Sequence, residues 1–238
     1  EIDLMIRQFQ TTMMRARFSS VPVISAPSGM ALGGGCELSL HCDAIQAHAE
    51  TYIGLVEFGV GLIPAGGGTK EMTLRASDSY APGDPELNHL QEYFMTIATA
   101  KVATSAHEGK ALGYIKPSDE ITLNRARLLA DAKRKAIELS EAGYTQPLER
   151  KDIKVHGQSS LALFEAGITG MLYGKYISEH DALIARKLGY VMSGGDLSSP
   201  TEVSEQYLLD LEREAFLSLT GEPKTVERIH SILFKGKP

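Results

Sequence analysis

Two glycine clusters, each beside an apolar run, place the tightest constraint on how this chain can fold. The first is GMALGGGCEL (Gly29–Leu38), which follows the apolar run VPVISAP (Val21–Pro27). The second is PAGGGTK (Pro64–Lys70), which precedes the run EMTLRA. An apolar run, a glycine turn and a helix in repeated order are typical of α/β folds. We therefore predict a buried strand at 21–26, a helix at 35–41 and a second helix after the second cluster.

The sequence changes character after Ser77, where helical periodicity dominates. The pattern predicts helices at 2–18, 119–142, 201–220 and 224–234, short extended pieces at 43–49 and 51–55, and helix caps at SAHE (105–108) and SEHD (178–181). The predicted organisation is an α/β part over 1–76 and a helical C-terminal region over 77–238. The second region is expected to pack on the first or on a neighbouring subunit.

Composition excludes several classes of protein. Hydrophobic content of 43% and charged content of 23% are ordinary for a globular chain. The net charge of −6 argues against a nucleic-acid surface, because phosphate binding needs a basic field. No apolar run approaches the roughly 20 residues of a membrane span. Cys36 and Cys42 have neither disulfide-framework nor zinc-ligand spacing, so we expect two buried thiols and a cytoplasmic location.

The glycine clusters do not fit the common nucleotide motifs. In GGGTK the lysine follows the threonine, which is the wrong order for a Walker A loop, and neither cluster fits GxGxxG or GxSxG. What remains is backbone that can donate N–H groups to an anion or a developing oxyanion at a helix N-terminus. The alternative is a tight turn without a ligand.

Two glutamates accompany these turns. Glu37 lies in the first turn of a predicted helix, where the helix dipole alone would favour it. Glu57 interrupts the apolar run IGLVEFGVGLIP (Ile53–Pro64) without a cationic neighbour. A buried, unpaired carboxylate is costly, so Glu57 needs a partner or a catalytic role. The two could converge on one water, one as base and the other as acid.

At these residues the sequence resembles the crotonase superfamily, specifically enoyl-CoA hydratases. The resemblance is specific over VPVISAPSGMALGGGCELSLHCD and TYIGLVEFGVGLIPAGGGTK and looser over the rest of the chain. It implies a crotonase-like spiral of ββα repeats, an acyl-CoA thioester as substrate and hydration across its 2,3-double bond in fatty-acid β-oxidation. The C-terminal part resembles the hydratase end of bacterial 3-hydroxyacyl-CoA dehydrogenase fusion chains.

The resemblance also implies roles for individual residues. Glu37 and Glu57 would be the catalytic pair, and the Gly34 N–H would be one donor of the oxyanion hole. Substrate-binding positions would be Gly33, Pro64, Gly67 and Lys224. Lys224 is the nearest candidate for a family lysine that contacts CoA phosphates, and a solvated lysine is the alternative. The stripe Leu87, Leu90, Phe94 and Ile97 is expected to be a core face, with an acyl-tail pocket as the alternative.

Cofactor and partner expectations follow from the same resemblance. Hydration would require no cofactor and no metal; coenzyme A would enter as part of the substrate, and NAD would matter only in a dehydrogenase half elsewhere. A homo-oligomer or a dehydrogenase domain in the same chain is the expected partner. The family's first oxyanion donor and its adenine-pocket loop would precede Glu1, so the isolated chain is expected to be a poor enzyme. The alternative functions are an enoyl-CoA isomerase and a truncated, non-catalytic assembly module.

Overall fold

A computed structural model describes residues 1–81, 83–85 and 87–236 of the chain. Its helices are α1 (Ile2–Arg17), α2 (Gly34–Leu40), α3 (Gly68–Asp78), α4 (Asn88–Ala98), α5 (Ala106–Ala111), α6 (Leu128–Glu141), α7 (Gln158–Tyr173), α8 (Glu179–Met192), α9 (Glu205–Thr220) and α10 (Pro223–Lys235), with short 3₁₀ turns η1 (Glu57–Val60) and η2 (Arg125–Arg127). Its strands are β1 (Ile24–Ser25), β2 (Met30–Leu32), β3 (Ala44–His48), β4 (Tyr52–Gly54), β5 (Glu120–Thr122), β6 (Ile153–Val155) and β7 (Thr201–Val203).

The strands of the N-terminal part stack one turn of the chain on the next. Parallel pairing joins β1 to β3, with Ile24 opposite Ala44, and β2 to β4, with Met30 opposite Tyr52. Along the chain, β1 and β2 are followed by α2, and β3 and β4 are followed by η1 and α3. This repeated strand–strand–helix order confirms the predicted α/β architecture.

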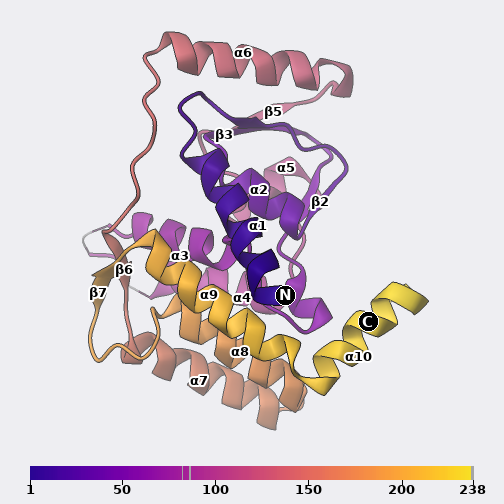
Figure 1. Ribbon diagram of the computed structural model, residues 1–238, viewed down its shortest axis with the longest axis vertical. Helices are drawn as coiled ribbons and strands as arrows, with labels where there is room; N and C mark the ends of the chain where they lie inside the picture. Colours follow the sequence, from indigo (N-terminus) through magenta and orange to yellow (C-terminus); the bar gives the residue numbers. More distant parts are fainter. Residues whose placement is uncertain (82, 86, 237–238) are drawn as a thin grey trace.

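The helical elements enclose these small sheets from several sides. In Figure 1, α6 lies along the top beside β5 and β3, while α7, α8 and α9 form the lower part. Helix α3 runs between the two parts, and most of its residues are buried. Helix α10 extends away from the body at the lower right, beyond its contact with η1.

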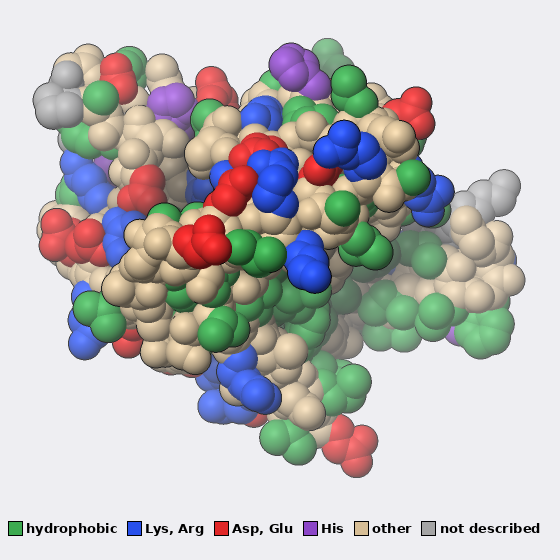
Figure 2. All heavy atoms as spheres, turned by 90° about the horizontal axis from the view of Figure 1, so that it is seen from above, with side chains coloured by type: hydrophobic (Ala, Val, Ile, Leu, Met, Phe, Trp, Pro, Cys, Tyr) green, Lys and Arg blue, Asp and Glu red, His purple; other side chains and the backbone are tan. Residues whose placement is uncertain are grey.

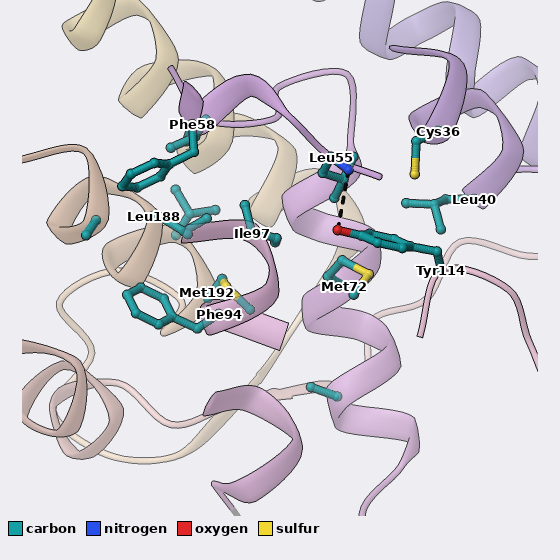
Figure 3. Packing of buried hydrophobic residues seen from close by; sticks show 14 of the residues in the cluster. Cys36, Leu40, Leu55, Phe58, Met72, Phe94, Ile97, Tyr114, Leu188 and Met192 are labelled. Carbon is teal, nitrogen blue, oxygen red and sulfur yellow. Dashed lines mark hydrogen bonds between the residues drawn. The ribbon is translucent and has the colours of Figure 1, made fainter. Parts of the chain in front are cut away.

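One continuous core joins the sheets to the helical layer. Figure 3 shows Leu55, Met72 and Ile97 from separate elements of this core. Tyr114 is fully enclosed, and its hydroxyl donates to Lys101 O at 2.9 Å and accepts from Leu55 N at 3.4 Å. This phenol therefore ties the loop that leads to η1 to the segment after α5.

The predicted stripe on α4 is a core face. Leu90, Phe94 and Ile97 are buried, and the Phe94 ring stacks on Phe164 of α7 at a centroid distance of 4.2 Å. The predicted capping box at 178–181 is confirmed, because Ser178 and Asp181 exchange side-chain and backbone hydrogen bonds.

Two predicted helices were too long at their N-terminal ends. Helix α6 begins at Leu128 rather than 119, because residues 120–122 form β5 and pair with β3. Helix α9 begins at Glu205, because residues 201–203 form β7 and pair with β6. In both places pairing with a distant strand overrides the local helical period. The boundary between 1–76 and 77–238 stays a prediction, although β5 from the second region extends the sheet of the first.

The outer surface of the α6 layer is solvated and charged. Arg134 bonds Glu138 at 2.8 Å, and Lys135 bonds Glu120 at 2.7 Å. On the face seen in Figure 2, acidic and basic side chains are interspersed rather than sorted by sign. Such exposed pairs contribute little to stability, typically about 0–1 kcal/mol each.

Candidate active site

The first glycine cluster delivers Glu37 into the interior. Gly33 precedes α2 with φ of 55°, a backbone conformation that favours glycine, and its N–H donates to Gly54 O at 2.9 Å. Helix α2 then begins at Gly34, so Glu37 lies in its first turn and is only 2% exposed. Gly34 belongs to the same turn, whose first N–H groups have no acceptor within the helix.

The second glycine cluster binds the Glu37 carboxylate. Its Oε1 accepts the backbone N–H of Gly66 at 2.8 Å and that of Gly68 at 2.9 Å. These donors lie at the start of α3, where Gly67 has φ of 103° and Thr69 Oγ1 donates to Pro64 O at 2.9 Å. A Cβ added at Gly68 would lie 2.8 Å from Glu37 Oε1. Glycine is therefore needed for the backbone to approach this carboxylate so closely.

Glu57 reaches the first glycine cluster from η1. A Cβ added at Gly33 would lie 3.1 Å from Glu57 Oε1, which places this carboxylate directly against the turn that starts α2. The residue as a whole is half-buried, but Oε2 is enclosed and has no hydrogen-bond partner among the described residues. An enclosed acceptor without a donor is costly unless a ligand or water satisfies it.

The two carboxylates influence each other's protonation. Burial raises the pKa of Glu57 to about 7. Burial first, and then the charges of Glu57 and Glu212, raise the pKa of Glu37 well above its usual range, against the opposing N–H groups of Gly66 and Gly68. Interacting groups of this kind titrate as a pair. Both shifts favour the protonated form, so this pair holds its protons to higher pH than ordinary carboxyl groups do.

An aromatic ring covers the turn that carries these groups. The half-buried Phe9 of α1 lies against Gly34, where an added Cβ would be 3.0 Å from its Cζ, and it also contacts Gly66. The neighbouring Cys36 is buried as a free thiol whose pKa burial, Glu57 and Glu37 all raise. Cys42 is also free and buried, as expected.

The structure brings most of the predicted site residues together. Gly33, Gly34, Pro64 and Gly67 all lie in the two turns around Glu37. Lys224 does not lie there: it is exposed on α10, where it lines a surface groove of about 750 Å³ with His180 and His230, among others. Its predicted contact with CoA phosphates therefore stays a prediction.

Sequence reasoning missed four residues that contribute to this site. Gly66 and Gly68, rather than Gly67, donate to Glu37, and only the shared cluster PAGGGTK hinted at them. Phe9 lies in the helix predicted at 2–18, and that pattern assigns it no role in the site. Glu212 stands in LEREAF, which looks like an ordinary charged helix face, and nothing local marks it as buried.

Two searches of the described residues bear on other classes of site. In residues 1–81, 83–85 and 87–236 no group of three or more His, Cys, Asp or Glu side chains is arranged to hold a metal ion. Within the same ranges no helix combines the length and the apolar character needed to cross a bilayer.

Comparison with known proteins identifies relatives of this arrangement. Residues 3–82 match the sequence family described as Enoyl-CoA hydratase/isomerase. All 238 residues align at 47% identity with a protein of Bacillus subtilis named "Probable 3-hydroxyacyl-CoA dehydrogenase", covering 30% of it. The Peroxisomal bifunctional enzyme of Cavia porcellus is 30% identical over 87% of this chain and 25% of its own length. The chain thus spans less than a third of each of these two relatives.

A solved structure shows the same fold at low sequence identity. The crystal structure of an enoyl-CoA hydratase from Bacillus halodurans superposes with a TM-score of 0.56 at 18% identity. The alignment covers 95% of this chain and 66% of that one. At this identity the likeness concerns the fold alone, and it confirms the predicted crotonase-like architecture.

Proposed function

Because residues 3–82 match the family described as Enoyl-CoA hydratase/isomerase, we propose that this chain hydrates trans-2-enoyl-CoA to 3-hydroxyacyl-CoA as a crotonase-like enzyme. The observation that carries this proposal is that the Glu57 carboxylate lies against the glycine turn that starts α2, the helix of the buried Glu37, and that its charge acts on the Glu37 carboxylate. Their coupled protonation supplies an acid and a base to one water molecule.

In the proposed reaction, one carboxylate takes a proton from water while the water oxygen bonds to C3 of the substrate. The electrons of the double bond move toward the thioester, whose oxygen becomes an enolate oxyanion. The N–H of Gly34 is the proposed donor to this oxyanion, at the start of α2 where the helix dipole also favours negative charge. The other carboxylic acid then protonates C2, so one water is added and the pair keeps its proton.

Hydration transfers no electrons, so the proposal includes no redox cofactor, and coenzyme A enters only as part of the substrate. Gly33, Pro64 and Gly67 are proposed to line the thioester end of the site, and Lys224 is the candidate contact for the CoA phosphates. We further propose that the chain acts in fatty-acid β-oxidation beside an NAD-dependent dehydrogenase segment that would consume its product. The name of the Bacillus relative, a 3-hydroxyacyl-CoA dehydrogenase, supports the dehydrogenase part of this proposal.

An isomerase is the second candidate, because the family description includes that activity. Moving a double bond along the acyl chain needs one carboxylate that removes a proton from one carbon and returns it to another. Adding water needs a base for the water and an acid for C2. The presence of both Glu37 and Glu57 therefore favours hydration over isomerisation.

The test is an assay with crotonyl-CoA, in which hydration removes the ultraviolet absorbance of the conjugated thioester. It should be run on the 238-residue chain and on the longest natural polypeptide that contains it, beside a 3-enoyl-CoA to detect isomerase activity. Glu37→Gln should abolish most hydration, whereas Glu138→Gln on the exposed face of α6 should not. If the protein isomerises the 3-enoyl-CoA but does not hydrate crotonyl-CoA, the isomerase becomes the leading candidate. If it catalyses neither reaction, the non-catalytic assembly module is the remaining candidate.

A further inference from the structure

Another buried carboxylate, that of Glu212 on α9, holds the turn that binds Glu37. Its side chain is fully enclosed, with Oε1 accepting Gly67 N at 2.6 Å and Oε2 accepting Lys70 N at 2.8 Å. The hydratase proposal does not use this residue. Its position in the sequence is 145 residues from Gly67, so only the tertiary fold brings the two together.

The two carboxylates divide the N–H groups of one turn between them. Gly66 and Gly68 donate to Glu37, whereas Gly67 and Lys70 donate to Glu212. These are the free donors at the start of α3, which normally need capping acceptors. Moving one set of donors necessarily moves the other, because they alternate along the same stretch of backbone.

Nothing local could replace Glu212 as the cap of α3. The cap position is Gly67, which has no side chain and a φ of 103°. A Cβ there would lie 2.6 Å from the His41 ring, so no capping side chain fits. The cap must come from another element, and α9 supplies it.

Among the described residues, no cationic side chain forms a direct ion pair with Glu212. Lys70 directs its ammonium to Glu71 and Glu205, at 2.7 and 3.0 Å, so only its backbone N–H contacts Glu212. The Gln10 side chain of α1 packs against the same helix, where its Nε2 donates to Leu209 O at 2.9 Å. Burial raises the pKa of Glu212 to about 8, and its charge in turn raises the pKa of Glu37.

We propose that Glu212 is a positioning residue for Glu37: by anchoring Gly67 and Lys70 it keeps the Gly66 and Gly68 N–H groups directed at the Glu37 carboxylate. The catalytic part of this inference rests on the proposed hydratase function, but the structural part does not. Glu212 therefore acts through the turn and touches no reacting atom.

Two substitutions separate the geometry of Glu212 from its charge. Glu212→Gln keeps the length of the side chain but removes its charge and one of its two acceptor oxygens. Glu212→Asp keeps the charge but shortens the reach. Leu219→Ala, two turns along α9 and fully buried, is the matched control for simple loss of stability.

The first measurement is independent of activity. Backbone amide proton shifts of Gly66 and Gly68, measured by NMR, should move upfield in both Glu212 variants as their bonds to Glu37 lengthen, and should stay near wild type in Leu219→Ala. Unchanged Gly66 and Gly68 amides in both Glu212 variants would overturn the inference, whatever the activity. If Glu212→Gln does not fold, Glu212→Asp alone decides the outcome in the same way.

The second measurement concerns catalysis. Both Glu212 variants should lower kcat for crotonyl-CoA hydration by about 10- to 100-fold with little change in KM, since small misplacements of catalytic groups have effects of this size. Only Glu212→Gln should also shift the alkaline part of the pH dependence of kcat to lower pH. Above about pH 8 the wild-type Glu212 is ionised and its charge raises the pKa of Glu37, and the variant lacks this charge. If the Glu212 variants lose no more kcat than a Leu219→Ala variant of equal melting temperature, Glu212 only caps α3 and does not position Glu37. A wild type without hydratase activity would refute the proposed function, while the amide shifts still decide whether Glu212 holds the turn.

Discussion

The ammonium Nζ of Lys70 lies 3.0 Å from Oε2 of Glu205, and both side chains are fully enclosed. The same ammonium contacts Glu71 at 2.7 Å and His41 at 3.0 Å. Arg17 of α1 bonds Glu205 from the other side at 2.7 Å. This network joins α1, α3 and α9 directly behind the turn that binds Glu37.

Removing the central cation should therefore destabilise the fold. We expect Lys70→Met to lower the free energy of unfolding by about 3–5 kcal/mol, because Glu71 and Glu205 would stay buried with one partner fewer. Urea denaturation measures this change. Arg134→Met, which breaks an exposed pair with Glu138, is the control and should cost at most about 1 kcal/mol. Equal losses in the two variants would show that burial does not matter here.

The two candidate catalytic glutamates should behave as one unit. Glu37→Gln and Glu57→Gln should each lower crotonyl-CoA hydration by roughly 10²–10⁴-fold. Because both act on one water, the double variant should lose less than the product of the single losses. Steady-state rates of the four proteins measure the coupling. Fully multiplicative losses would mean that the carboxylates act in separate steps.

Glu57 should make stability depend on pH. Its pKa is raised from 4.5 to about 7 in the folded chain, so its contribution is present below 4.5 and is lost as pH rises through about 7. Glu57→Gln cannot ionise and avoids that loss. The melting temperature of the variant relative to wild type should therefore be higher at about pH 8.5 than at about pH 5.

The ionisable neighbours of Glu57 do not cancel this difference in melting temperature between the two pH values. Glu37 and Cys36 remain in both proteins, and their pKa values are raised well above the usual range. A difference in melting temperature that stays constant between the two pH values would contradict the burial of an ionisable Glu57. The same variant should lose hydration, so stability and activity would move in opposite directions.

Glycines in the two clusters should differ sharply in how well they tolerate substitution by alanine. Gly68→Ala places a Cβ 2.8 Å from Glu37 Oε1 and 2.9 Å from both Leu55 and Pro64, so it should displace the carboxylate and lower hydration. Gly35→Ala is the control, because it meets no atom within 4 Å and lies in a helix. There alanine should be neutral or stabilise by up to about 1 kcal/mol. Thermal melts and the crotonyl-CoA assay on both variants test the contrast; equal activity would mean that the turn can adjust.

The sequence by itself determined the local chemistry of this protein. Helices α2 and α3 and the unusual setting of Glu37 and Glu57 follow from short patterns of glycine, apolar residues and charge. The strand predicted at 21–26 is shorter and less buried than expected, since only Ile24–Ser25 pair with β3 and both are half-buried. Such patterns act between neighbours in the chain, where period and turn chemistry are decisive. They also supported the crotonase resemblance, which the family match over residues 3–82 confirms.

Only the tertiary structure decided what completes the site. Glu212 looks like a solvent-exposed helix charge, yet it is enclosed because the N–H groups of Gly67 and Lys70 replace its hydration. The tertiary structure likewise decides that Phe9 covers the glycines, since the packing of α1, and not its helical period, sets where the ring lies. Strands β5 and β7 were hidden in helical patterns because their partners are far away in sequence. A pattern within the chain carries no information about a partner that only folding brings into contact, so these features depend on the assembled core.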